Sequence, residues 1–111
     1  MSPFVPDRGQ IVWLDFDPQA GREPAARRPA FVLSPERYNR AVGLALFCPV
    51  TSRVKGYPFE MLLPDGLGVS GVVLADQVRS LDGRRRRAEF AADAPAGVTE
   101  AVRQKVLVLL R

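Results

Sequence analysis

Histidine is absent from the 111-residue chain, and cysteine occurs once, as Cys48. The first absence excludes every mechanism that needs an imidazole, and with it most zinc sites. A lone cysteine excludes a disulfide framework. Because Cys48 lies in an apolar run and has no histidine to activate it, we expect a buried, inert thiol.

Long apolar runs are also lacking. The longest, "AVGLALFCPV" at residues 41–50, is far shorter than the roughly 20 residues of a membrane span, and the first ten residues contain no signal-peptide core. We therefore expect an intracellular, cytoplasmic protein with no membrane contact. A chain of 111 residues, 47% of them hydrophobic, is sufficient for one domain over residues 1–111 with a core of its own.

Positive charge is concentrated in two segments. Residues 22–55 hold seven basic and two acidic side chains, a net +5, and residues 79–87 hold five basic and one acidic, a net +4, whereas the whole chain has only +4. Nearly all the cations are arginines, whose guanidinium groups suit phosphate contacts. This pattern favours an anionic polymer as partner; the alternative is a coding bias that places arginine where lysine would serve.

Short segments of alternating or apolar residues between turn signals predict a protein made mainly of strands. In "QIVWLDFDP" at residues 10–18, Val12, Leu14 and Phe16 share one face of the expected strand. "SPERYNR" at 34–40 predicts a short helical turn with a serine cap. Further strands are expected at residues 28–34, 42–50 and 57–63, as one strand or a bent pair at 72–81, and at 84–90 after a tight turn at residues 82–83.

The end of the chain has a different periodicity. Apolar residues recur at helical spacing after Asp93 and Pro95, which are helix-opening residues; they are Val98, Val102, Val106, Leu109 and Leu110. The predicted fold is therefore mainly β with short helices: a small, twisted, partly closed β-barrel with a C-terminal helix.

Three polar clusters fall on predicted loops or strand ends, where binding residues concentrate. Taken singly, each has an ordinary explanation as a solvated charge, a turn or a structural hydrogen-bonded pair. Together they contain a carboxylate base, hydroxyls and phosphate-binding guanidinium groups, without a phosphate-binding Gly-Lys-Ser/Thr loop or a Gly-x-Ser-x-Gly elbow. The clusters are Glu23 with Arg27 and Arg28, Thr51 and Ser52 with Arg53 and Lys55, and Asp76 and Gln77 with Arg79.

Several blocks carry a resemblance to a known family: "VPDRGQIVWLDFDP", "GREPAARRPAFVLSP", "CPVTSRVKGYPFE" and "VLADQVRS". In this order they resemble the MazF/PemK-type toxin endoribonucleases, from about Val5 to the terminal helix. The resemblance implies an SH3-like barrel, a homodimer, and cleavage of single-stranded RNA with no metal or cofactor. It also implies inhibition by an acidic antitoxin.

The family's site residues transfer to particular positions. The arginine of its "RP" step falls on Arg28, the threonine of its "P-x-T" step on Thr51, the acidic loop residue on Glu23, and the Asp-Gln pair on Asp76 and Gln77. Arg27 stands where a histidine can occur in relatives. The other residues expected to contact RNA are Arg27, Ser52, Arg53, Lys55, Arg79, Arg84 and Arg86.

The chemistry that this resemblance implies is attack by the RNA 2′-hydroxyl on the adjacent phosphorus, which leaves a 2′,3′-cyclic phosphate and a 5′-hydroxyl. Arg28 would stabilise the charge that develops on the phosphate oxygens, and Thr51 would orient the phosphate. Glu23 is the first candidate for the general base because it is close to Arg28 in sequence, and Asp76 is its rival.

The sequence leaves two interpretations open for each of two features. The arginine run at residues 84–87 either follows the RNA backbone or forms the exposed face of an edge strand, where charge discourages aggregation. Trp13, Tyr57 and Phe59 either stack on RNA bases or belong to the core or the dimer interface.

Two other functions compete with RNA cleavage. A gyrase-poisoning toxin of the same fold is disfavoured because such toxins end in Trp-Gly-Ile, and this chain ends Leu109-Leu110-Arg111. A non-catalytic RNA-binding barrel would accommodate the arginines but leaves the combination of Glu23, Arg28 and Thr51 unexplained.

Overall fold

The computed structural model describes residues 3–16 and 27–111. In these residues it contains seven strands and two helices. In chain order they are β1 (Gln10–Asp15), β2 (Arg27–Val32), α1 (Glu36–Val42), β3 (Ala45–Thr51), β4 (Glu60–Leu62), β5 (Val72–Leu74), β6 (Arg79–Leu81), β7 (Glu89–Asp93) and α2 (Ala96–Leu109).

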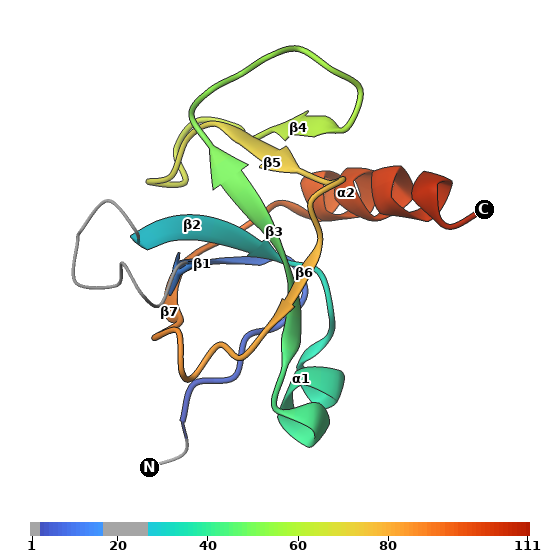
Figure 1. Cartoon of the computed structure of the whole chain (residues 1–111). Helices are drawn as coiled ribbons and strands as arrows, with labels where there is room; N and C mark the ends of the chain where they lie inside the picture. The colour runs from blue at the N-terminus through green and yellow to red at the C-terminus, as the bar shows by residue number, and fades with distance from the viewer. Residues whose placement is uncertain (1–2, 17–26) are drawn as a thin grey trace.

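The strands form one antiparallel sheet in the order β4-β5-β3-β2-β1-β7 (Figure 1), with β6 as an additional partner of β3. Strand β3 pairs with two short strands in succession. Thr51 at its end pairs with Val72 of β5, and Phe47 near its start pairs with Arg79 of β6. The expected fold class, mainly β with short helices and a C-terminal helix, is confirmed. The expected bent pair of strands over residues 72–81 is also confirmed, as β5 and β6.

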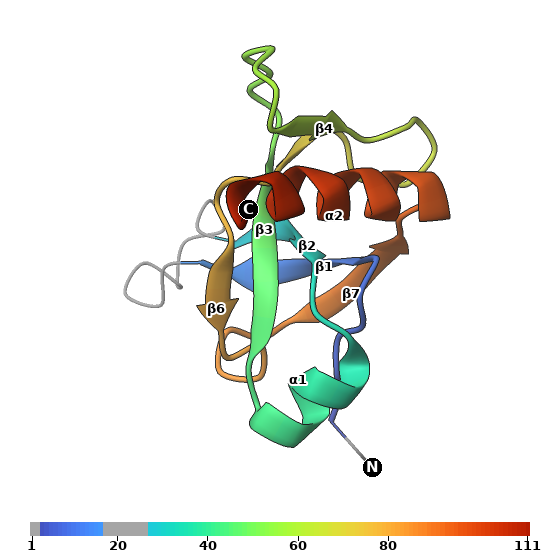
Figure 2. The same cartoon turned by 90° about the vertical axis from the view of Figure 1, so that its right-hand side faces the viewer.

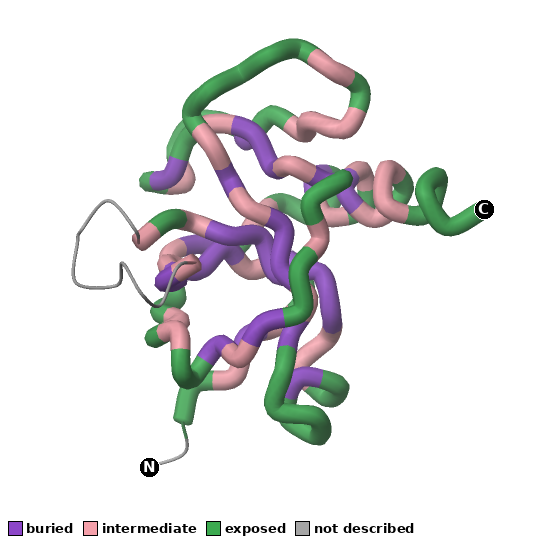
Figure 3. Tube along the Cα trace, viewed as in Figure 1, coloured by how far each residue is buried: buried purple, intermediate pink, exposed green. Residues whose placement is uncertain are grey.

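Apolar residues cover both faces of the central strands, and Figure 3 shows the buried stretch running through them. Val12 and Leu14 of β1 pack with Phe47 in one cluster, as the alternation predicts. Ile11 packs on the opposite face with Phe31 in a second cluster. The sheet therefore has a core on each side, which holds the ends of β2 and β3 in a fixed relation.

Helix α2 lies across the sheet in front of β3 (Figure 2). Val98 and Val102 are buried in the core, and Val106 is half-buried, so the predicted helix and its apolar stripe are confirmed. The stripe continues onto the surface, because Leu109 is 49% exposed and Leu110, beyond the helix, is 74% exposed. Neither helix is long and apolar enough to cross a membrane in the part of the chain that the structure describes.

Three local predictions are wrong. The arginine run is a turn over residues 83–87 rather than a strand, and β7 begins only at Glu89. Strand β4 begins at Glu60, so the segment from Tyr57 belongs to the preceding loop. Ser34 is not the N-cap residue of α1, because Pro35 occupies that position.

Two of these errors, the arginine run and the Ser34 cap, have a local cause. The Asp82 carboxylate accepts hydrogen bonds from the backbone N–H groups of Arg84 and Arg85 and so stabilises a turn. The Ser34 hydroxyl donates to the side-chain oxygen of Asn39 and accepts from the Leu46 N–H at 2.8 Å. It is therefore engaged with Asn39 and β3, and within the described part of the chain α1 has no side-chain cap hydrogen bond.

Candidate active site

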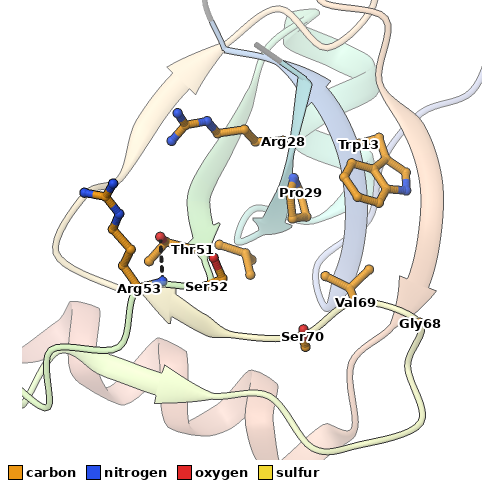
Figure 4. A pocket seen from close by; sticks show the side chains of 10 residues that line it. Trp13, Arg28, Pro29, Thr51, Ser52, Arg53, Gly68, Val69 and Ser70 are labelled. Carbon is orange, nitrogen blue, oxygen red and sulfur yellow. Dashed lines mark hydrogen bonds between the residues drawn. The ribbon is translucent and has the colours of Figure 1, made fainter. Parts of the chain in front are cut away.

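A hollow of about 610 Å³, which we call the Arg28 hollow, opens where the start of β2, the end of β3 and the loop segment of residues 68–70 meet (Figure 4). It brings together residues from two of the three predicted clusters, Arg28 from one and Thr51 and Arg53 from another. Its lining residues are Trp13, Arg28, Pro29, Val50, Thr51, Ser52, Arg53, Gly68, Val69 and Ser70. The combination of a polar rim and an apolar wall suits a ligand with both charged and flat groups.

The cations of this hollow are available to an anion. Figure 4 shows Arg28 and Arg53 extending to the same side of the hollow, with Thr51 between them. Within residues 3–16 and 27–111, the ion pairs involve Arg27, Arg40, Arg87 and Arg103, and neither Arg28 nor Arg53. Two exposed guanidinium groups beside a hydroxyl form a site that can bind and polarise a phosphate group.

The backbone around Thr51 is fixed by two neighbours. The Thr51 side-chain oxygen accepts a hydrogen bond of 3.1 Å from the Arg53 N–H. On its other side, Gly71 lies so close that a β-carbon there would be 2.2 Å from the Thr51 carbonyl oxygen. The hydroxyl of Thr51 is therefore presented from a backbone that has little room to shift.

Arg27 has surroundings quite different from those of Arg28. Its guanidinium lies 3.1 Å from the buried carboxylate of Asp15, and the Arg87 guanidinium lies 2.7 Å from the same carboxylate. Arg27 also donates to the Arg87 carbonyl at 2.6 Å and to Glu89 at 3.2 Å. We call Asp15, Arg27 and Arg87 the Asp15 cluster; it occupies the guanidinium of Arg27 with protein partners, a structural role that sequence reasoning missed.

Arg86 joins the same region. Its guanidinium donates to the carbonyl oxygens of Asp15 and Phe16 at the end of β1. Neither interpretation of the arginine run anticipated this role, because both assumed a strand. Arg84 is exposed on the turn, where it remains open to solvent.

The Asp15 cluster leads to a prediction about acid stability. The hydrogen bond from Arg87 is the largest influence on the pKa of Asp15, and with Arg27 it lowers this pKa below the ordinary 3.8 despite burial. The stabilisation is thus fully present above about pH 4 and is lost as the pH falls through the lowered pKa. Asp15→Asn should reduce the free energy of unfolding by about 2 kcal/mol at pH 7.

Denaturant unfolding of wild type and Asp15→Asn, measured at pH 7 and near pH 3, checks this expectation. The difference should shrink at the lower pH, because wild-type Asp15 is then increasingly protonated. Glu36→Gln is the control, since the one ion pair of Glu36 among the described residues is an exposed pair with Arg40, and the change should alter stability by less than about 0.5 kcal/mol. A difference that stays the same at both pH values would contradict the ionic role of Asp15.

The Asp-Gln pair does not join the Arg28 hollow. Asp76 accepts a hydrogen bond of 2.8 Å from the Tyr57 hydroxyl, and this bond is the main cause of a raised pKa for Tyr57. Asp76 lines a second hollow, of about 750 Å³, beside α2, and Gln77 is exposed in the following turn. The two hollows share no lining residue among those that the structure describes.

The remaining predicted site residues are dispersed. The Lys55 N–H donates to the Glu60 carboxylate at 2.9 Å, and the Arg79 guanidinium lies 5.6 Å from the centre of the Phe16 ring. Trp13 packs against the core, as one of its two interpretations expected, and it also lines the Arg28 hollow; its stacking on RNA bases stays a prediction. Glu23 lies outside the described residues.

Cys48 is fully buried, as expected from the sequence. Burial, with a smaller contribution from the Asp76 charge, raises the pKa of its thiol to about 12. The thiolate is therefore scarce at neutral pH, and Cys48 is unsuited to act as a nucleophile. Across residues 3–16 and 27–111, no group of three histidine, cysteine, aspartate or glutamate side chains is close enough to hold a metal ion.

Comparison with known proteins places these features in a family. Residues 7–110 match the family model described as "PemK-like, MazF-like toxin of type II toxin-antitoxin system". The chain is 44% identical to "Endoribonuclease toxin MazF" of Escherichia coli strain K12 over 110 residues, covering 99% of this chain and 98% of that protein. It is 31% identical to "Endoribonuclease PemK" of Escherichia coli, covering 94% of this chain and 81% of that protein.

Solved structures agree with this result. The crystal structure of MazF from Deinococcus radiodurans has 63% identity and a TM-score of 0.88, covering 97% of this chain and 98% of that one. A MazE–MazF crystal structure from the same organism matches with 58% identity and a TM-score of 0.87, covering 97% of both chains. The chain therefore belongs to the family of PemK-like, MazF-like toxins of type II toxin-antitoxin systems.

Proposed function

We propose that this protein is a sequence-specific, metal-independent endoribonuclease that cleaves single-stranded mRNA and so inhibits translation and growth. The observation that carries the proposal is the meeting of Arg28, Thr51 and Arg53 around one hollow with an apolar wall. A phosphate fits the cationic rim, and an unstacked base fits against Trp13. The relatives named above as endoribonucleases support the same reaction.

The proposed reaction is an internal transfer at phosphorus. The 2′-hydroxyl oxygen forms a bond to the adjacent phosphorus, its proton passes to a base, and the bond to the 5′-oxygen breaks as that oxygen gains a proton. Arg28 stabilises the negative charge on the non-bridging oxygens, and the Thr51 hydroxyl orients the phosphate. The products are a 2′,3′-cyclic phosphate and a 5′-hydroxyl, and DNA is resistant because it lacks the nucleophile.

Glu23 is the proposed general base, with Asp76 as its rival. The placement of Asp76 in a different hollow supports Glu23, because a base must reach the proton that it removes. A carboxylate is a weak base for a hydroxyl, so we expect slow turnover. Arg28 is the proposed source of charge stabilisation first and of the leaving-group proton only second.

The protein is further proposed to act in the cytoplasm as one domain over residues 1–111, as a homodimer, and under inhibition by an acidic antitoxin of the MazE type. The exposed apolar residues at the end of α2, Leu107 to Leu110, support association with a second copy. The MazE–MazF complex of the Deinococcus relative and the basic segments of this chain support an acidic inhibitor.

The function is tested by incubating the purified protein, in excess EDTA, with a long mixed-sequence RNA and with single-stranded DNA of the same sequence. We expect RNA alone to be cut, at a recurring short motif, with cyclic phosphate and 5′-hydroxyl ends. Loss of cleavage in EDTA would contradict the metal-independent mechanism. Intact RNA at every salt concentration, with retained RNA binding, would identify a non-catalytic RNA-binding protein instead.

A further inference from the structure

The loop of residues 52–59 joins β3 to β4 and places Ser52 and Arg53 at the rim of the Arg28 hollow. It projects beyond the sheet at the top of Figure 1. Side chains rather than strand pairing hold its turn: the Glu60 carboxylate accepts hydrogen bonds from the N–H groups of Lys55 and Gly56, at 2.9 and 2.8 Å. Gly56 supplies the positive φ of 86° that this turn requires.

Three further hydrogen bonds tie the returning limb of the loop to the rest of the fold, and one is the backbone bond of 2.9 Å from the Ala75 N–H to the Phe59 carbonyl. The Tyr57 hydroxyl donates to Asp76, which follows β5, at 2.8 Å. The Lys105 ammonium group of α2 donates to the Pro58 carbonyl at 2.6 Å. The loop is therefore fixed to two separate elements of the scaffold, and its conformation is set before any ligand binds.

Asp76 is badly placed for chemistry at the Arg28 hollow. Its carboxylate is engaged by the Tyr57 hydroxyl, and it lines the other hollow together with Leu46 and Val78. A general base has to lie within hydrogen-bonding reach of the hydroxyl that it deprotonates, directly or through one water. The contacts of Asp76 instead resemble those of a group that holds a loop.

We propose that Tyr57 and Asp76 are a positioning pair that holds the 52–59 loop in its RNA-binding conformation, so that they determine RNA affinity and transfer no proton. The inference rests on the proposed RNA cleavage and deepens it. Arg53 then contacts the phosphodiester backbone while its loop is already ordered, which reduces the conformational entropy lost on binding. Without the pair, the loop samples other conformations, and Arg53 binds phosphate less tightly.

The test separates positioning from proton transfer by comparing Asp76→Ala with Asp76→Asn. Asparagine keeps the oxygen that accepts the Tyr57 hydrogen bond but cannot act as a base. We expect Tyr57→Phe and Asp76→Ala to raise KM for RNA cleavage about 3- to 10-fold, with kcat and the pH–rate profile nearly unchanged. The double variant should be no worse than either single one, and Asp76→Asn should remain close to wild type.

Tyr38→Phe is the matched control, because it removes the same hydroxyl from an exposed tyrosine of α1 and should leave KM unchanged. If Asp76→Asn slowed the turnover of bound RNA by about 100-fold or more while Tyr57→Phe had no effect, the proposal would be overturned and Asp76 would be the base. Unchanged KM in both Tyr57→Phe and Asp76→Ala, or additive effects in the double variant, would also overturn it.

Failure of the proposed function is visible separately, in wild-type protein that leaves RNA uncut. The pair is then tested by amide hydrogen exchange at residues 53–56 and by binding of a mixed-sequence 2′-O-methyl RNA, which offers no free nucleophile. Faster exchange and about 3- to 10-fold weaker binding in Tyr57→Phe would support the positioning role. Unchanged exchange and binding would overturn it.

Discussion

Arg28→Ala should lower the rate of RNA cleavage by about 100- to 1000-fold, the loss expected when one preorganised donor to a developing oxyanion is removed. Arg28 is exposed and, within residues 3–16 and 27–111, makes no ion pair, so its removal leaves no unpartnered buried charge there. We therefore expect the variant to fold and unfold like wild type. Single-turnover cleavage of a mapped RNA substrate measures the rate, and denaturant unfolding measures the stability.

Arg40→Ala is the matched control for that variant. It removes the same charge from an exposed arginine of α1, whose only described ion pair is with Glu36 one turn earlier. A uniform electrostatic effect on RNA would affect both variants to a similar extent. Full activity in Arg28→Ala would show that the assignment of this hollow as the reaction centre is wrong.

Gly71→Ala should both destabilise the fold and disable the site. The backbone of Gly71 has a φ of 119°, which residues with a β-carbon rarely adopt. The added carbon would lie 2.2 Å from the Thr51 carbonyl oxygen and 2.8 Å from its carbon, so the end of β3 would have to move. We expect the free energy of unfolding to fall by about 3 kcal/mol or more, and cleavage by the folded fraction to fall with it.

Gly66→Ala separates backbone strain from the clash. Gly66 has a similar φ of 93°, but nothing lies within 4 Å of a β-carbon built there. The free energy of unfolding of Gly66→Ala should fall only by the roughly 1–2 kcal/mol that the unfavourable backbone conformation costs, and the variant should keep its activity. Equal losses of stability in the two variants, with activity retained in both, would show that contact with Thr51 does not matter.

The elements that sequence analysis located well are those with a local periodicity. The alternation in β1 correctly predicted that Val12 and Leu14 share one face of the strand, and the helical spacing correctly predicted that Val98 and Val102 face the core. The arginine run was misassigned because charge says little about backbone conformation, whereas the Asp82 side chain there stabilises a turn. The exposure of the end of α2 could not be predicted from the sequence either, because the spacing of apolar residues does not indicate where a helix extends beyond the sheet.

For the site, the sequence was sufficient to propose Arg28 and Thr51, which the structure brings to one hollow, and to reject imidazole and thiol chemistry. It could not say which of the clustered charges face one another. Arg27 and Arg28 are adjacent, yet Arg27 belongs to the Asp15 cluster and Arg28 lines the hollow. Asp76, the rival of Glu23 as the general base, is hydrogen-bonded to Tyr57 and lines another hollow.

The sequence by itself determined the strand and helix periodicities, the family and the chemical types available for catalysis, because these depend on residue identity and near neighbours. Only the tertiary structure decided which side chains bind one another. Arg87 reaches Asp15 across 72 positions, and Tyr57 reaches Asp76 across 19. Such contacts arise from sheet register and loop closure, which bring distant residues together, and no local pattern encodes them.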